Sequence, residues 1–417
     1  MDVGEELGRL LRLAGRTSSE VDVLREEVAA LHDCLASAGL VSSERYQAQK
    51  HRRLFAAIRR KHPPTLDRTL ADALQTRELV RAATGSAGLG ALHALRASSR
   101  GVGATVAAVV ESLWTSCVCI CGGQCEGELL SGADCADLRA FGMAGDGRGP
   151  EAWETLPPMS CPRRCFAAAA VGGFLYVSGG GDGWQALNSA ERFDPGTRAW
   201  AALPPMSERR VGAAAAGLDG RLFVCGGGRL DLRSAEMYIP TAEVWASLPP
   251  MLEQRWGVAA ASMGRCLLAV GGRSGPYALS SVDRFDAAAG GWEPLPPMHH
   301  RRGGAAAVAV GHRLIVCGGS DASQDLSSVE QYDAAAKRWE VLPPMQHRRW
   351  GSTAVCYAGS IYVFGGSDAG RDLSSVERLQ VDPPSAVLPD RAAWEALVPC
   401  LQAPRSLAAA AVLRAWA

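Results

Sequence analysis

Residues 342–354 read LPPMQHRRWGSTA, and the first four letters of this stretch recur through the chain. LPPM also begins at Leu156, Leu203, Leu248 and Leu295, each time as the end of a longer motif, W-x-x-L-P-P-M. Successive copies of this motif lie 45 or 47 residues apart, and a worn copy, WEALVPC, begins at Trp394. A fixed period of this length predicts a structure built from repeated units.

A second marker, a pair of glycines that closes an apolar run, follows the same period from the second pair onward. The pairs begin at Gly122, Gly179, Gly226, Gly271, Gly318 and Gly365. Six pairs indicate six units. The first unit, from about Gly101, is eroded, because no LPPM precedes it and a long insertion stands near GMAGDGRG.

Each unit contains four short β-rich runs separated by turns that hold Gly, Asp and Pro. The first run is rich in alanine, which suits a crowded inner strand. The second is apolar on both faces: in IYVFGG, Ile361 and Val363 point one way, and Tyr362 and Phe364 the other. Such a strand belongs to a sheet that lies between other sheets. Four-stranded sheets packed face to face around an axis form a propeller.

Aromatic residues and prolines mark the outer part of each unit. An aromatic residue stands seven positions before Trp in four units, and we expect these rings to supply contact area between neighbouring blades. The pairs are Phe193 and Trp200, Tyr238 and Trp245, Phe285 and Trp292, and Tyr332 and Trp339. Pro-Pro cannot donate hydrogen bonds to a sheet, so it is expected to end the outermost strand.

The order Gly-Gly, Glu-x-aromatic and Trp, at a period near 47 residues, resembles the kelch repeat. The resemblance covers about Gly101 to the C-terminus, with degenerate first and last repeats. It implies an all-β fold, a six-bladed kelch β-propeller of four-stranded antiparallel blades, with an α-helical N-terminal extension. Two segments compete for the inner strand of the first blade: VGATVAAVV from Val102, and RSLAAAAVL from Arg405. Alternatively, the C-terminal segment begins a blade that this chain does not finish.

Residues 1–98 are interpreted as the helical extension. Leu and Val alternate at three and four residues over 7–38, which predicts a short coiled coil and a homodimer, or else a helix that folds back on its neighbours. A basic, amphipathic helix is expected over 44–61, and it either contacts an anionic surface or partner or forms a solvated face. Further helices are expected over 65–98.

The overall composition narrows the class of protein. The chain has 417 residues, 47% of them hydrophobic, and a formal net charge of zero, so no general attraction to nucleic acid is predicted. The N-terminus lacks an apolar signal core, and no stretch approaches the roughly 18 apolar residues of a membrane span. These features predict a cytoplasmic protein whose 13 cysteines are reduced thiols.

Neither a metal, a cofactor nor a catalytic residue is predicted. Cys117, Cys119, Cys121, Cys125 and Cys135 form the one metal-like cluster in the sequence, but three of them share one strand face, which favours core packing over a zinc site. The kelch resemblance includes copper oxidases and sugar epimerases, so a carbohydrate-active enzyme is the competing hypothesis. We predict that the protein is not an enzyme, because no motif for such chemistry is recognised.

An arginine that follows each LPPM is the candidate binding residue. The proposed ring consists of Arg164, Arg210, Arg255, Arg302, Arg349 and Arg405, with Trp256 and Trp350 as aromatic walls. Equivalent positions of a propeller lie in a ring around one mouth of its channel, where guanidinium groups would attract carboxylates or phosphates. The resemblance to kelch domains of ubiquitin-ligase adaptors implies contact with acidic peptides. The alternative is that these arginines bond loop carbonyls and hold the blades together.

The sequence therefore predicts a non-catalytic interaction module, a scaffold or substrate-recognition adaptor. Its expected partner is a protein with an acidic or phosphorylated segment, bound at the arginine-ringed mouth. The N-terminal residues show no recognisable BTB or BACK pattern, so an adaptor role follows only from likeness of fold.

Overall fold

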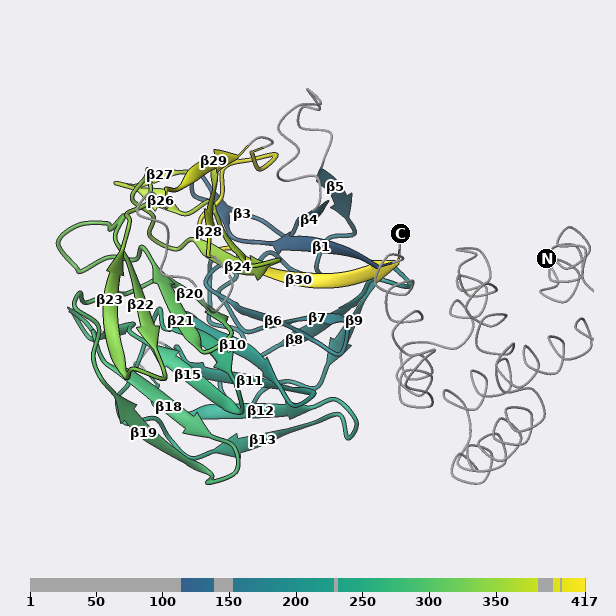
Figure 1. Ribbon diagram of the computed structural model, residues 1–417. Coiled ribbons are helices and arrows are strands. Elements are labelled where there is room, and N and C mark those ends of the chain that lie inside the picture. Colours follow the sequence, from purple (N-terminus) through teal and green to yellow (C-terminus); the bar gives the residue numbers. More distant parts are fainter. Residues whose placement is uncertain (1–113, 139–152, 229–231, 382–392, 398–399, 417) are drawn as a thin grey trace, which may run out of the picture. The chain divides into compact units, whose positions relative to one another are not determined.

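The computed structural model describes residues 114–138, 153–228, 232–381, 393–397 and 400–416 (Figure 1). The coiled coil predicted over 7–38, the basic helix over 44–61 and the helices over 65–98 all lie outside the described residues. So does the segment from Val102. Thr115–Ala415 form one compact unit.

Six four-stranded antiparallel sheets make up this unit, which confirms the six-bladed propeller. From its innermost to its outermost strand, blade 1 consists of β30 (Ala409–Trp416), β1 (Trp114–Cys121), β4 (Ala133–Asp137) and β5 (Trp153–Leu156). In the same inner-to-outer order, blade 2 consists of β6 (Ala167–Val171), β7 (Phe174–Ser178), β8 (Ala190–Asp194) and β9 (Ala199–Leu203). Blade 3 consists of β10 (Ala213–Leu218), β11 (Arg221–Gly226), β12 (Ala235–Ile239) and β13 (Val244–Leu248).

The other three blades repeat this plan. Blade 4 consists of β14 (Ala259–Met263), β15 (Cys266–Val270), β18 (Val282–Asp286) and β19 (Gly291–Leu295). Blade 5 consists of β20 (Ala306–Val310), β21 (Arg313–Cys317), β22 (Val329–Asp333) and β23 (Arg338–Leu342). Blade 6 consists of β24 (Thr353–Tyr357), β25 (Ser360–Phe364), β28 (Val376–Gln380) and β29 (Glu395–Leu397).

The C-terminal strand closes the ring. β30 pairs with β1, so the inner strand of blade 1 comes from the end of the chain and its other three strands precede blade 2 in sequence (Figure 1). This settles the competition between the two segments in favour of the one that follows Arg405. The C-terminus therefore completes the first blade and does not begin a new one.

Antiparallel pairing places alternate connections at opposite ends of every blade. One end carries the connections from an outer strand to the next inner strand, together with those between the second and third strands; we call this the loop face. Short hairpins lie in three of the latter connections, namely β2 (Gln124–Cys125) with β3 (Glu128–Leu129), β16 (Arg273–Ser274) with β17 (Tyr277–Ala278), and β26 (Ser367–Asp368) with β27 (Arg371–Asp372). The LPPM motif leads the chain onto this face.

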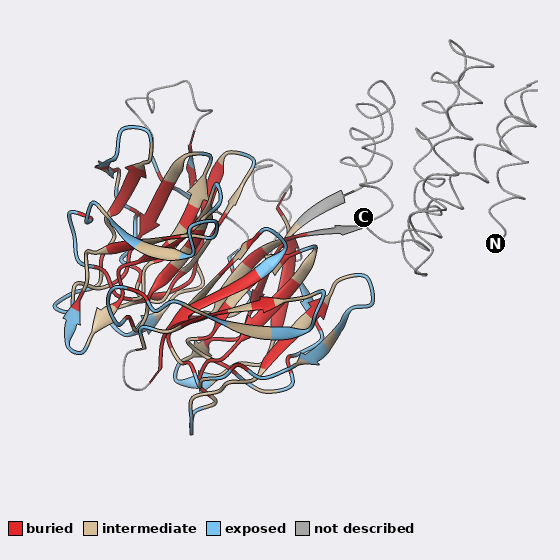
Figure 2. Cartoon of the chain, turned by 90° about the horizontal axis from the view of Figure 1, so that it is seen from below, coloured by how far each residue is buried: buried red, intermediate tan, exposed pale blue. Residues whose placement is uncertain are grey.

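The core lies between neighbouring blades, and the second strands are buried almost throughout (Figure 2). One cluster, for example, joins Leu156 and Met159 of blade 1 and the connection after it to Phe193 and Trp200 of blade 2. The predicted aromatic pairs are in contact, with ring centroids 5.2–5.3 Å apart. Each pair lies within one blade, and the clusters confirm that these rings also supply contact area between blades.

In blades 2 to 6, a tryptophan in the outer strand or directly before it also bonds the preceding blade. Trp339 Nε1 donates a hydrogen bond to the carbonyl of Pro296, the first proline of the LPPM motif one blade earlier, at 2.7 Å. The same bond, at 2.8 Å, joins Trp200 to Pro157, Trp245 to Pro204, Trp292 to Pro249 and Trp394 to Pro343. The repeated proline thus ends one blade and supplies an acceptor to the next.

Candidate functional site

The recurring arginines lie beneath the loop face and are buried. The side chains of Arg210, Arg255, Arg302 and Arg349 have no exposed surface, and Arg405 is 6% exposed. The equivalent residue of blade 2 is Arg163, 1% exposed, and not Arg164 as predicted. The reason is spacing, since each of these arginines lies four residues after the buried Met of LPPM, or after the buried Leu401 that takes its place, and Arg163 follows Met159 in this way.

Each buried arginine forms an ion pair with an acid on the third strand of its own blade. Arg302 Nη2 lies 2.9 Å from Glu330 Oε1, and neither side chain is exposed. The other pairs are Arg163–Glu191 at 2.7 Å, Arg210–Glu236 at 2.9 Å, Arg255–Asp283 at 2.9 Å, Arg349–Glu377 at 2.8 Å and Arg405–Asp134 at 2.7 Å. Taking these charges out of water is costly, so the pairs depend on good geometry and further hydrogen bonds.

Those further bonds come from the backbone. Arg302 Nη1 donates to the carbonyls of Gly318, at 2.7 Å, and Ser328, at 2.8 Å. The second carboxylate oxygen of Glu330 accepts the N–H of His299, at 2.7 Å, which is the residue after LPPM. The paired glycines, the arginine and the acid therefore act together to fix the connection between two blades.

A closed circuit of backbone hydrogen bonds surrounds the axis. The residue two positions after each buried arginine donates its N–H to the equivalent carbonyl of the preceding blade, at 2.7–3.1 Å. The six residues are Cys165, Gly212, Gly257, Gly304, Gly351 and Leu407. All six have a positive φ, which costs glycine little but strains Cys165 (53°) and Leu407 (55°).

Trp256 and Trp350 pack over this circuit. A Cβ atom on Gly212 would lie 2.6 Å from Trp256 Nε1, and one on Gly304 would lie 2.5 Å from Trp350 Nε1. Both tryptophans are half-buried. They therefore cover the glycines beside the axis and still present part of their surface at the loop face.

Exposed arginines stand directly before the buried ones in three connections. Arg209, Arg301 and Arg348 are exposed, in contrast to Arg210, Arg302 and Arg349. Arg209 Nη1 donates to Gln185 Oε1 at 2.6 Å and to the carbonyl of Ala186 at 3.0 Å. Among the described residues, no carboxylate lies within ion-pair distance of Arg348. In these three doublets, the first arginine therefore carries the accessible positive charge of this face.

Arg164 lies deeper than these three residues. It is half-buried, and its Nη1 donates to Gln124 Oε1 of blade 1 at 2.8 Å.

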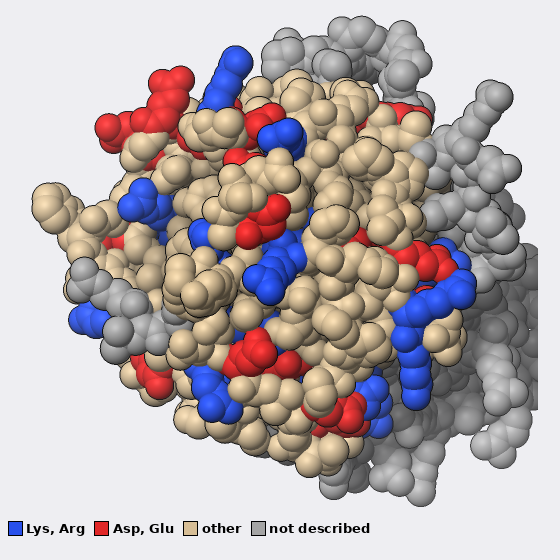
Figure 3. All heavy atoms as spheres, turned by 90° about the vertical axis from the view of Figure 1, so that its left-hand side faces the viewer, with Lys and Arg blue, Asp and Glu red and all other residues tan. Residues whose placement is uncertain are grey.

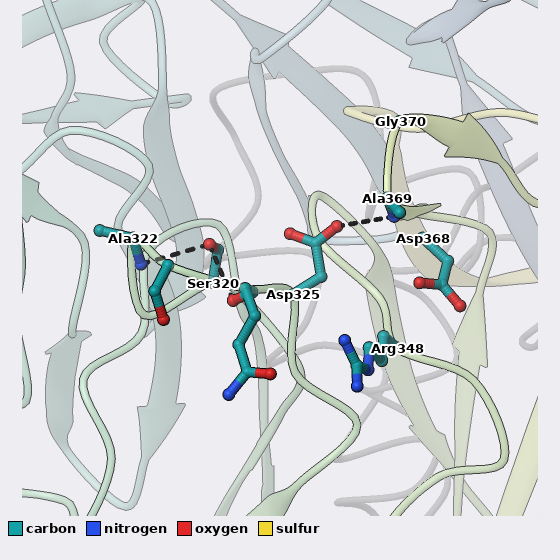
Figure 4. Close-up of a pocket in the computed structure, with 9 residues that line it drawn as sticks. Ser320, Ala322, Asp325, Arg348, Asp368, Ala369 and Gly370 are labelled. Carbon is teal, nitrogen blue, oxygen red and sulfur yellow. Dashed lines mark hydrogen bonds between the residues drawn. The ribbon is translucent and has the colours of Figure 1, made fainter.

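Arg348 lines a pocket between blades 5 and 6 (Figure 4). The pocket has a volume of about 400 Å³ and is formed by Ser320, Ala322, Ser323, Gln324, Asp325, Arg348, Asp368, Ala369 and Gly370. Figure 4 shows Arg348 in the pocket lining together with Asp325 and Asp368. Asp325 Oδ2 accepts the N–H of Ala369 at 3.0 Å, which links the two blades along the pocket wall.

One wall of the pocket is a turn that hydrogen bonds to Asp321 hold in place. Asp321 Oδ1 accepts hydrogen bonds from Ser323 Oγ, at 2.6 Å, and from the N–H groups of Ser323, at 2.8 Å, and Gln324, at 2.9 Å. The bond from the Ser323 hydroxyl, followed by those from the backbone, lowers the pKa of Asp321 to about 2. The carboxylate is therefore ionised at neutral pH and holds the turn in shape.

Two large aromatic side chains are exposed on the loop face. Trp184, in the connection between β7 and β8, is 94% exposed, and Tyr277, in the hairpin of blade 4, is 67% exposed. Exposed aromatic residues of this kind are typical of binding hot spots. On the side of the propeller seen in Figure 3, acidic and basic side chains are interspersed, and no broad field of one sign covers it.

Sequence reasoning missed the acids that pair with the buried arginines. The signal was present as a constant spacing, since the acid follows the arginine by 28 residues in four pairs and by 26 in the fifth. It also missed the exposed arginines, because both members of each doublet look alike in sequence.

The described residues include no helix that is long and apolar enough to cross a membrane. Within the same ranges, no group of three or more His, Cys, Asp or Glu side chains is arranged to hold a metal ion.

Comparison with known proteins agrees with the repeat structure. The family model of the Kelch motif matches residues 162–207, 209–252, 255–299, 301–346 and 348–382. Among solved structures, one titled "Structure of YjhT" is similar over 64% of this chain and 91% of that chain, with a TM-score of 0.54 and 16% sequence identity. At this identity the likeness concerns the fold alone. No curated protein matches the chain.

Proposed function

The chain belongs to the kelch family, and we propose that it is a non-catalytic protein-interaction module whose loop face binds an acidic or phosphorylated peptide segment. The observation that carries this proposal is the pocket between blades 5 and 6, with the unpaired guanidinium of Arg348 in it. An exposed arginine without a carboxylate partner is free to form a charge-assisted, bidentate hydrogen bond with a ligand.

The other groups in the pocket suit a peptide. Asp368 offers oxygen atoms as acceptors for backbone N–H groups, and the hydroxyls of Ser320 and Ser323 and the amide of Gln324 also lie in the lining. A segment with one acidic or phosphorylated side chain would place its charge on Arg348 and its backbone donors toward these acceptors. Since the pocket is small, it holds one or two residues, and the rest of the partner lies across the face.

Trp184 and Tyr277 extend this surface. Each is a large aromatic side chain that gains contact area when a partner covers it. Arg209 and Arg301 repeat the position of Arg348 on neighbouring blades, although Arg209 already bonds the loop beside it. The buried arginines support the same surface from below by fixing the connections that carry these groups.

A peptide array tests the proposal. The full chain is applied to acidic and phosphorylated peptides, each beside its neutral amide or unphosphorylated counterpart. We expect retention of a subset of the charged peptides and loss of that retention in Arg348→Ala. Arg338→Ala is the control, because Arg338 is also an exposed surface arginine but is paired with Glu340 and begins an outer strand, away from the loop face. Retention that is unchanged by Arg348→Ala would contradict the assignment of the pocket.

A further inference from the structure

Two cysteines face each other inside the blade that closes the ring. Cys119 of β1 and Cys135 of β4 are direct partners in the antiparallel register. Directly opposed residues have Cα atoms about 4.5–5.5 Å apart, which falls within the range of about 4.4–6.8 Å that a disulfide spans. Cys119 is 2% exposed and Cys135 is 9% exposed.

The neighbouring cysteines do not share this geometry. Cys117 faces Asp137 and Cys121 faces Ala133 in the same pair of strands. Each is therefore a diagonal neighbour of Cys135, at about 7–8 Å, which is too far for a disulfide without movement of the backbone. In the registers of the described strands, no other cysteine stands opposite a second one.

The two thiols already interact. A hydrogen bond with Cys135, together with burial, raises the pKa of the Cys119 thiol well above its usual value, and the same bond lowers the pKa of Cys135. These directions fit a Cys119 S–H that donates to the sulfur of Cys135. Cys135 Sγ also lies 3.9 Å from Glu154 Oε2 of β5, on the edge of the blade where Glu154 is 60% exposed.

We propose that Cys119 and Cys135 form a reversible disulfide that fastens β1 to β4 in the closing blade. With hydrogen peroxide as the oxidant, Cys135 is oxidised first, because it is the more accessible sulfur and the more readily ionised. Its thiolate attacks one peroxide oxygen, the O–O bond breaks, and the products are a sulfenic acid and water once hydroxide takes up the released proton.

The second step forms the bond between the strands. Cys119 attacks the sulfenic sulfur, the S–O bond breaks, and the hydroxyl leaves with the thiol proton as a second water. In total, two thiols lose two electrons to one peroxide. A dithiol reductant reverses the reaction by thiol–disulfide exchange.

The bond would stabilise the blade in which the ring is closed. Blade 1 is the blade whose inner strand is not continuous in sequence with the others, since β30 comes from the end of the chain. A disulfide between its second and third strands restricts the unfolded chain between residues 119 and 135. We therefore expect the oxidised propeller to unfold at a higher temperature than the reduced one.

Peptide mapping of the peroxide-treated full chain tests this proposal. Cleavage after glutamate separates the two cysteines, because Glu126 and Glu128 lie between them. We expect a linked pair of fragments in which tandem fragmentation places the bond on Cys119 and Cys135, and its loss after treatment with dithiothreitol. A Cys135 that remains reduced, or one that is linked to Cys117, Cys121 or Cys125, would overturn the assignment.

Variants and thermal unfolding complete the test. Cys121→Ala is the matched control, because Cys121 is buried on the same strand and face; it should keep the linked fragments, and Cys119→Ala should lose them. If either variant does not fold, the mapping of the unmodified chain still decides. Oxidation should raise the unfolding midpoint of the wild type, and equal midpoints for the oxidised and reduced chains would contradict a role in closing the ring.

Discussion

The loop face has two layers of arginine, and they differ in burial and in their bonding partners although their members are adjacent in sequence. In the lower layer, Arg349 is buried and bonded to Glu377 and to the carbonyl of Gly365. In the upper layer, Arg348 is exposed and faces a pocket. The lower arginine stabilises the connection between two blades, and the upper one is available to a partner. A shift of one residue along the chain separates a buried, structural arginine from an exposed one, to which we assign a binding role only as a proposal.

Breaking a lower-layer pair should have the largest effect. Arg302→Met leaves the carboxylate of Glu330 buried without its cation, which costs about 3–5 kcal/mol. The second substitution, in Arg302→Met/Glu330→Leu, should recover only part of this loss, because Glu330 also accepts the N–H groups of His299 and His300. Denaturant unfolding of the two variants measures both values, and a loss below about 1 kcal/mol in Arg302→Met would refute the structural role.

Low pH should weaken the ion pairs of the lower arginine layer. Burial by itself would raise the pKa of Glu330, but the hydrogen bond and charge of Arg302 outweigh it, so the pKa is lowered. A carboxyl whose pKa is lowered by folding stabilises the protein above its unfolded pKa, about 4.3, and this contribution is lost as the pH falls through the folded value. The free energy of unfolding should therefore drop below about pH 4. Glu330→Gln should be less stable than the wild type at pH 7, and its free energy of unfolding should fall less on acidification. If the free energy of unfolding fell equally with pH in both proteins, the Arg302–Glu330 pair would not be the cause of the acid sensitivity.

Substitution of a tryptophan should have a smaller effect on the free energy of unfolding. Trp339→Phe keeps a ring against Tyr332 but removes the hydrogen bond to Pro296, at a cost of about 1 kcal/mol. Trp350 supplies the control, since its Nε1 is buried and has no hydrogen-bond partner among the described residues. Trp350→Phe should therefore cost less than Trp339→Phe in the same unfolding experiment, and the opposite order would mean that the bond to the preceding blade contributes little.

A substitution in the hydrogen-bond circuit at the axis should have the smallest effect, and it should stabilise the protein. Cys165 holds a positive φ that glycine holds in four of the other five blades. Cys165→Gly should raise the free energy of unfolding by at most about 1 kcal/mol, because relief of strain exceeds the added entropy of the unfolded chain. Gly257→Ala is the reciprocal variant and should lower it. Destabilisation by both changes would show that the Cys165 side chain matters more than its backbone.

The repeat made the fold predictable, and the prediction of individual residues failed where one repeat departs from the common pattern. Six Gly-Gly pairs and a constant period were enough to predict six blades of four strands. The choice of Arg164 over Arg163 was wrong, although the spacing from the preceding motif distinguishes them, because only Arg163 lies four residues after the Met of LPPM. The glycine that follows each buried arginine by two residues in blades 3 to 6 is replaced by Cys165, so this second marker is missing from CPRRCF.

Burial of the arginines could not be predicted from the local sequence. The acid that neutralises Arg349 lies 28 residues away, and only folding of the blade brings it within 2.8 Å. The same holds for the pocket, whose walls come from the connections of blades 5 and 6. The pairing of Cys119 with Cys135 likewise depends on a register that strand periodicity alone does not determine.

The most direct measurement compares Arg348→Ala with Arg349→Ala for both unfolding and peptide retention. We predict that Arg348→Ala unfolds within about 0.5 kcal/mol of the wild type and loses retention of the charged peptides. Arg349→Ala should lower the free energy of unfolding by about 3–5 kcal/mol. If Arg349→Ala were as stable as the wild type and lost the peptides while Arg348→Ala kept them, the two layers would have the opposite roles.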